Sequence, residues 1–130
     1  MARIIDTNII IRFLTSNDPL LVEKIAEYLK KPENKFVLTD VAIAELVWVL
    51  LSVYTLPKET IIDKIGGLIE LPNFILSKSV ISRTLALYSQ HNIDYIDAYL
   101  AAYAIENEIK EIVSYDKDLN KIKSLKRVEP

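Results

Sequence analysis

The chain has 130 residues, of which 51% are hydrophobic and 26% are charged, and its formal net charge is −2. This composition predicts a single globular domain over residues 1–130 and argues against disorder. The chain has no cysteine, which excludes disulfides and thiolate metal sites. Its hydrophobic runs are too short to cross a bilayer, and no secretory leader is recognisable, so we expect a cytoplasmic protein without a membrane anchor.

The first half of the chain predicts two strands, each followed by two helices. The strands are 3–5 and 36–38; the helices are 9–14, 19–31, an apolar helix that begins after Thr39-Asp40, and 57–71. Asp18 followed by Pro19 is a typical helix start, with an N-cap aspartate and proline at the first helical position. Gly66 and Gly67 should weaken or kink the last of these helices by about 1 kcal/mol each.

The second half continues the alternation of strands and helices. It predicts a strand at 73–76, helices at 79–90 and 94–107, a strand at 111–114, a helical turn at 117–122 and a strand at 126–129. Strands separated by helices predict an α/β fold with a central parallel sheet covered by helices on both faces. In such sheets ligands bind beyond the carboxyl ends of the strands, where Asp6 and Asp116 lie.

Four carboxylates stand where apolar or neutral residues are expected: Asp6, Glu45, Asp97 and Asp116. Glu45 is the only charge between Val41 and Tyr54, a helix so apolar that we expect Glu45 to be buried. Buried charges are normally paired or bound to metal, and no matching set of buried cations is apparent. With a single histidine, the sequence predicts an acidic pocket for a hard divalent cation such as Mg²⁺ or Mn²⁺. Hydrolysis of phosphodiesters is the natural reaction class.

Each acid also has an ordinary structural explanation. Aspartates at strand-to-helix junctions often cap helices, and Glu45 could lie on an exposed stripe with Ser52. The cap alternatives concern Asp6 before Thr7-Asn8, the pair Asp94 and Asp97, and Asp116, with Asp118 as a competing cap and a further candidate ligand. Basic side chains could form a phosphate-binding rim, although surface lysines usually serve solubility. The rim candidates are Arg12, Lys117, Lys121, Lys123, Lys126 and Arg127.

The order and spacing of four acidic motifs resemble the PIN-domain ribonucleases, and in length and layout the VapC toxins of type II toxin–antitoxin pairs. The motifs are Ile4-Ile5-Asp6-Thr7-Asn8, Ala44-Glu45-Leu46-Val47-Trp48-Val49-Leu50, Asp94-Tyr95-Ile96-Asp97-Ala98-Tyr99-Leu100-Ala101-Ala102 and Ser114-Tyr115-Asp116-Lys117-Asp118-Leu119. The likeness covers essentially the whole chain. It departs from the family in having Ser114 where threonine is common and Leu119 where an aromatic residue is common.

The resemblance implies a three-layer α/β/α sandwich with a central parallel sheet and an Mg²⁺- or Mn²⁺-dependent endoribonuclease. It also implies a homodimer that a VapB-like antitoxin inhibits. Asp6 and Asp97 would bind the metal most directly, and Glu45 and Asp116 would complete its water-mediated shell. Asn8 and Ser114 would orient ligands or water from farther out.

Two other classes of function remain open from the residues alone. A catalytically silent PIN-like module could bind protein or RNA without turnover, although it would not need four charged pocket residues. A metal-dependent phosphatase or DNA nuclease would use similar carboxylates. Asp6-Thr7-Asn8 lacks the Asp-x-Asp pattern of aspartyl-phosphate enzymes, which disfavours the phosphatase.

Overall fold

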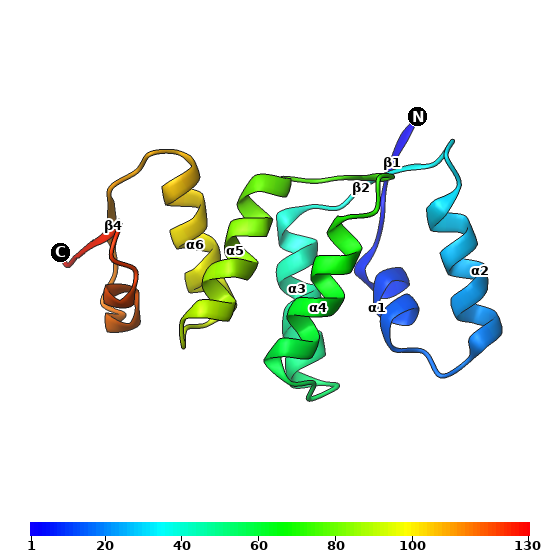
Figure 1. Cartoon of the computed structure of the whole chain (residues 1–130), viewed down its shortest axis with the longest axis horizontal. Helices are drawn as coiled ribbons and strands as arrows, with labels where there is room; N and C mark the ends of the chain where they lie inside the picture. Colours follow the sequence, from blue (N-terminus) through cyan, green and yellow to red (C-terminus); the bar gives the residue numbers. More distant parts are fainter. The chain divides into compact units, whose positions relative to one another are not determined.

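The computed structural model describes residues 1–130, and its contacts divide the chain into two units, Met1–Ser77 and Lys78–Pro130. Figure 1 labels the six α-helices and several of the strands. The single domain expected over residues 1–130 stays a prediction. None of the helices combines the length and the hydropathy needed to cross a membrane.

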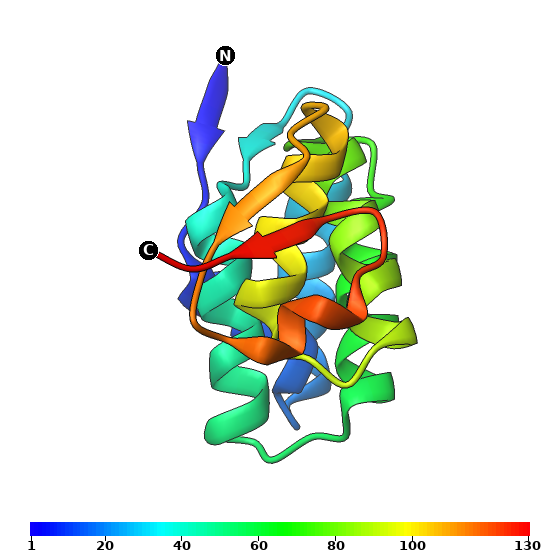
Figure 2. The ribbon, with the colours of Figure 1, turned by 90° about the vertical axis from the view of Figure 1, so that its left-hand side faces the viewer.

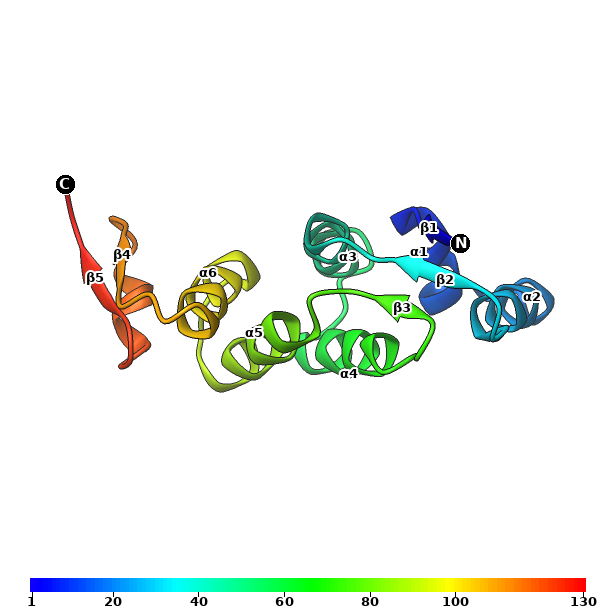
Figure 3. The ribbon, with the colours of Figure 1, turned by 90° about the horizontal axis from the view of Figure 1, so that it is seen from above.

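The first unit is built on three parallel strands, β1 (Ala2–Ile4), β2 (Lys35–Val37) and β3 (Phe74–Ile75), in the order β1-β2-β3. In Figure 3, β2 and β3 run side by side. Phe36 pairs with Arg3 on one side and with Phe74 on the other. Its ring lies 5.6 Å from that of Tyr28 and 6.0 Å from that of Phe74, so the central strand is anchored by aromatic packing.

Four helices complete the first unit: α1 (Thr7–Thr15), α2 (Pro19–Lys30), α3 (Asp40–Ser52) and α4 (Lys58–Ile69). The predicted N-cap of α2 is confirmed, since Asp18 Oδ1 accepts hydrogen bonds from the first amides of that helix. Thr39 caps α3 in the same way through the amide of Ala42. These helices bury an aliphatic core: Ile10, Leu29, Ile43, Leu46, Val47, Leu50, Ile61, Ile65 and Leu68.

Helix α4 runs without interruption through Gly66 and Gly67. A Cβ added at either glycine would meet no heavy atom within 4 Å. Neither glycine is therefore required by close packing, and the break in the helix that the sequence suggested is not seen. The expected cost of about 1 kcal/mol for each glycine in a helix stays a prediction.

The second unit pairs a helical hairpin with a small parallel sheet. Its elements are α5 (Lys78–Gln90), α6 (Tyr95–Glu106), β4 (Glu111–Val113), the 3₁₀ turn η1 (Lys117–Lys121) and β5 (Lys126–Val128). The two helices pack against each other, with Tyr88 and Tyr95 meeting edge to face at 5.6 Å. Figure 2 shows β4 and β5 side by side, with Ile112 opposite Arg127. Leu119 and Ile122 are buried beneath the connection between these strands.

The predicted α/β class and the parallel pairing of the strands are confirmed. The first unit contains three hydrogen-bonded parallel strands and the second unit contains two. Strand pairing is a contact between distant parts of the chain. Periodicity along the sequence therefore predicts a strand better than it predicts the neighbour of that strand.

Candidate acidic site

Asp6 follows β1 and is the N-cap residue of α1. Its Oδ1 accepts the amide of Asn8 at 3.3 Å and also lies 3.3 Å from the hydroxyl of Thr7. The alternative that Asp6 serves as a helix cap is thus correct for one carboxylate oxygen. Because both contacts use Oδ1, the second oxygen, Oδ2, is left for another ligand.

The side chain of Thr7 connects Asp6 with Glu45 of α3. Thr7 is only 7% exposed, and its hydroxyl donates a hydrogen bond to Glu45 Oε1. The same hydroxyl also contacts Asp6 Oδ1, so it lies between the two carboxylates. Thr7 therefore holds Glu45 close to Asp6 as a first acidic pair.

Thr7 was not among the candidate site residues, so this bridging residue was missed. The available signal was a hydroxyl residue directly after an acid at the end of a strand. Such a side chain stands close enough to the acid to share a hydrogen bond with it.

The prediction that Glu45 is buried is wrong, because the residue is exposed. Val41 and Trp48 of the same helix are also exposed, at 78% and 62%. Helix α3 buries its other side through its core leucines and isoleucine and still has apolar residues on its surface. High apolar content alone therefore did not reveal which face of the helix is covered.

Asp97 and Asp116 form a second acidic pair within the second unit. Asp97 lies in the first turn of α6, and Asp116 follows β4. Their side chains are hydrogen-bonded, and burial, this bond and the charge of Asp116 together raise the pKa of Asp97 to about 6. The charges of Asp94 and Asp118 contribute to the same shift. A hydrogen bond between two carboxyl groups requires a proton, and the raised pKa means that Asp97 holds its proton more tightly than an ordinary aspartate does.

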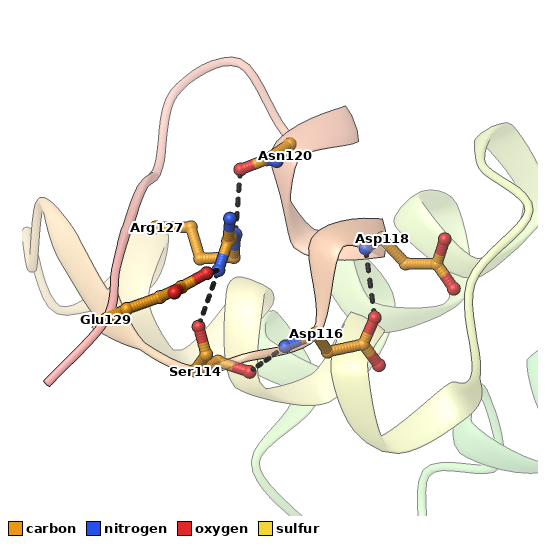
Figure 4. Close-up of polar contacts among 6 residues, drawn as sticks. All are labelled: Ser114, Asp116, Asp118, Asn120, Arg127 and Glu129. Atoms are coloured by element: carbon orange, nitrogen blue, oxygen red, sulfur yellow. Dashed lines mark hydrogen bonds and ion pairs between the residues drawn. The ribbon is translucent and has the colours of Figure 1, made fainter.

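Ser114 and Asp116 shape the turn that carries Asp116, the second member of this pair (Figure 4). The amide of Asp116 donates to Ser114 Oγ at 2.9 Å, and Asp116 Oδ1 accepts the amide of Asp118 at 2.9 Å. Asp116 is thus the N-cap of η1, while the carboxylate of Asp118 pairs with Lys121 at 3.0 Å. Asp94 occupies the N-cap position of α6 without a capping hydrogen bond from its side chain.

Asn8 and Arg12 lie with Asp6 along one cavity of about 860 Å³ in the first unit. Arg12 is exposed, as the proposed basic rim requires. Arg127 does not fit such a rim, because its side chain is only 11% exposed and its guanidinium is hydrogen-bonded within the protein. Lys121 is held by Asp118 and by the carbonyl of Asn92.

The donor groups of the two pairs suit a hard divalent cation. All four side chains offer carboxylate oxygens, the ligands that Mg²⁺ and Mn²⁺ prefer. Burial and the contact with Asp116 disfavour ionisation of Asp97, and a cation bound there would favour its charged form. No group of three or more acidic or histidine side chains is arranged to hold a metal ion. A single site formed by all four acids therefore stays a prediction.

The family model of the PIN domain matches residues 3–125, and the chain belongs to the PIN domain family. Proteins of this family are generally nucleases, which makes nuclease the class that fold and family define. No curated protein sequence matches the chain.

Among solved structures, the chain is similar to one in the crystal structure of VapBC2 from Rickettsia felis bound to a DNA fragment from their promoter. The identity is 17%, the alignment covers 100% of this chain and 99% of the other, and the TM-score is 0.43. It is also similar to a chain of a toxin–antitoxin complex from Klebsiella pneumoniae, at 17% identity, with 94% and 93% of the two chains covered and a TM-score of 0.35. At this level of similarity, neither structure assigns an activity or a residue role to this chain.

Proposed function

We propose that the chain is a metal-dependent endoribonuclease, the toxin of a VapBC-type pair, in which Asp6, Glu45, Asp97 and Asp116 act in one site. The observation that carries the proposal is the placement of Asp97 against Asp116, where burial, the hydrogen bond between the two side chains and the neighbouring charges raise the pKa of Asp97 to about 6. Such a pair is disfavoured in isolation and is typical of a site where function requires it. Membership in a family of nucleases supports the same conclusion.

Each residue has a distinct role in this proposal. Asp6 and Asp97 would hold Mg²⁺ or Mn²⁺ directly, and Glu45 and Asp116 would hold the waters around it. The bound ion would lower the pKa of a water and offset the charge that develops on the scissile phosphate. Thr7 fixes the carboxylate of Glu45, and the amide of Asp118 fixes that of Asp116. Asn8, in the first turn of α1, would orient substrate or water.

The test is cleavage of RNA by protein purified free of any partner. We expect cleavage with Mg²⁺ or Mn²⁺, none with EDTA, and none in Asp97→Asn. Asp63→Asn, on the exposed surface of α4, is the matched control and should cleave as the wild type does. A protein that binds RNA but leaves it intact throughout Mg²⁺ and Mn²⁺ titrations is instead a silent binding module. Cleavage of DNA but not RNA would make it a DNA nuclease.

An antitoxin segment is the partner we propose for the cavity of the first unit. The cavity is lined by apolar side chains from β1, α1 and α2, with Arg12 and Lys24 among its basic residues. An apolar segment with acidic residues fits such a lining. Because Asp6 and Asn8 also line the cavity, the bound segment would cover part of the acidic site.

This partner can be tested with the product of a small neighbouring reading frame that encodes a DNA-binding protein. We expect it to bind and to inhibit cleavage. Leu21→Glu, in the cavity lining, should abolish inhibition, and Leu20→Glu, which is 77% exposed and outside the lining, should leave it intact. Equal inhibition of both variants would place the partner elsewhere. The homodimer that we also propose is tested by light scattering of the purified protein.

A further inference from the structure

Arg127 makes a set of contacts that the proposed chemistry does not explain. It stands in β5 opposite Ile112, and its side chain is only 11% exposed, against 74% for the neighbouring Lys126. Its Nε donates to Asn120 Oδ1 at 3.0 Å, and its Nη1 donates to the carbonyl of Ser114 at 2.8 Å. The same Nη1 lies 2.5 Å from Glu129 Oε2. Figure 4 shows the guanidinium between these three partners.

The residues that Arg127 contacts enclose the turn of Asp116. Ser114 precedes that turn and Asn120 follows it, in η1. Between them, Ser114 Oγ accepts the amide of Asp116, and Asp116 Oδ1 accepts the amide of Asp118. The guanidinium thus ties together both ends of a seven-residue segment, 114–120, that has the acid near its middle.

The charge of Arg127 is already compensated within the protein, so its role differs from that of a phosphate-binding residue. Glu129 neutralises the guanidinium, and two of its N–H groups are used by Ser114 and Asn120. Hydrogen bonds from a charged donor are stronger than neutral ones, and a planar fork can hold several acceptors in fixed directions. Lysine has a single ammonium group on a flexible stem and cannot reproduce this geometry.

We propose that Arg127 is a positioning residue that fixes the 114–120 turn and thereby holds the Asp116 carboxylate against Asp97. The inference rests on the proposed function for its catalytic consequence. Its structural part stands on the hydrogen bonds alone. Partners that orient ligand carboxylates typically change metal affinity or activity when they are removed, although they do not touch the metal.

The structural part is tested by amide hydrogen exchange of the metal-free protein. Arg127→Gln should speed exchange of the Asp116 and Asp118 amides by about tenfold or more, because their turn loses its anchor. Arg127→Lys should restore little of this protection. Lys110→Gln removes an exposed charge from the same unit and should leave exchange unchanged. If Arg127→Gln proves unstable, Asn120→Ser removes one anchor from an exposed residue and should speed the same two amides.

The catalytic part is tested by Mn²⁺ binding, followed by electron paramagnetic resonance, and by steady-state cleavage. Arg127→Gln should weaken Mn²⁺ binding by about tenfold or more. It should also lower kcat with little change in KM for RNA. A folded Arg127→Gln protein with wild-type exchange at Asp116 and Asp118 and wild-type Mn²⁺ affinity overturns the inference. A wild-type protein that neither binds Mn²⁺ nor cleaves RNA refutes the proposed function alone. In that case, amide hydrogen exchange of Arg127→Gln and the wild type would still decide whether Arg127 fixes the turn.

Discussion

The two acidic pairs keep their carboxylates close in different ways. In the first unit a neutral hydroxyl, that of Thr7, lies between Asp6 and Glu45 and donates to the glutamate. In the second unit Asp97 and Asp116 touch directly, and the pKa of Asp97 is raised to about 6. A neutral donor lies between the first two acids, whereas the second two are in direct contact, and burial together with that contact raises the pKa of Asp97. The second pair therefore has more to gain from a cation.

The largest expected effect comes from removing the acids that we assign to the metal directly. Asp6→Asn and Asp97→Asn remove one acid from each pair. Each should lower kcat for RNA cleavage by more than about a hundredfold, because residues that only support metal ligands already cost up to about a hundredfold when they are removed. Glu45→Gln and Asp116→Asn should lose less activity, because we propose that these two acids contact the metal through water. The comparison uses initial rates at saturating Mg²⁺. A larger loss in Glu45→Gln than in Asp6→Asn would reverse the assignment within the first pair.

A smaller effect is expected from the hydroxyl of the first pair. Thr7→Val removes the donor between Asp6 and Glu45 and keeps the shape of the side chain. We expect a loss of about tenfold in kcat, corresponding to one hydrogen bond to a charged group. Thr7→Ser retains the hydroxyl and should retain most of the activity. If serine and valine are equally impaired, the methyl group of Thr7 matters and the hydroxyl does not.

The second pair should make stability depend on pH. The pKa of Asp97 is raised above its ordinary value of 3.8, so the folded protein binds this proton more tightly than the unfolded chain does. The resulting stabilisation is complete below about pH 4 and is lost as the pH rises through about 6.

Asp97→Asn should consequently be more stable than the metal-free wild type at pH 8, by on the order of 1 kcal/mol after solvent screening is allowed for. The difference should shrink toward pH 4. Urea unfolding at both pH values measures it, with Asp63→Asn as the control. An advantage of the same size at pH 4 and pH 8 would show that the carboxyl contact is not its cause.

The smallest expected effects concern the neighbours of Asp97. Asp116 acts on Asp97 through a hydrogen bond and a charge, whereas Asp94 and Asp118 act through charge alone. Asp116→Ala should therefore lower the pKa of Asp97 more than Asp94→Asn does. Carboxyl carbon NMR titrations of the metal-free variants give the order. An equal or larger shift in Asp94→Asn would place the dominant contact elsewhere.

Much of the fold could be predicted because its signals are local. Asp18-Pro19 marked the start of α2, and the acid-containing turn after β4 was expected as a short helical turn. The two pairings of acids could not be predicted, since the contact of Thr7 with Glu45 joins residues 38 positions apart. Arg127 was expected to be a surface cation. Its partners come from other parts of the chain and meet it only in the folded protein, so the sequence did not reveal that its side chain is covered. Glu45 was expected to be buried because the apolar content of α3 does not show which face is covered.

The central claim is that one acid from each pair holds the same ion. The most direct measurement is the Mn²⁺ affinity of the wild type, Asp6→Asn and Asp97→Asn, followed by electron paramagnetic resonance without RNA. We expect both substitutions to weaken binding at one and the same site by at least about tenfold. Wild-type Mn²⁺ affinity in Asp6→Asn, together with a loss in Asp97→Asn, would contradict it, because the two pairs would then act separately.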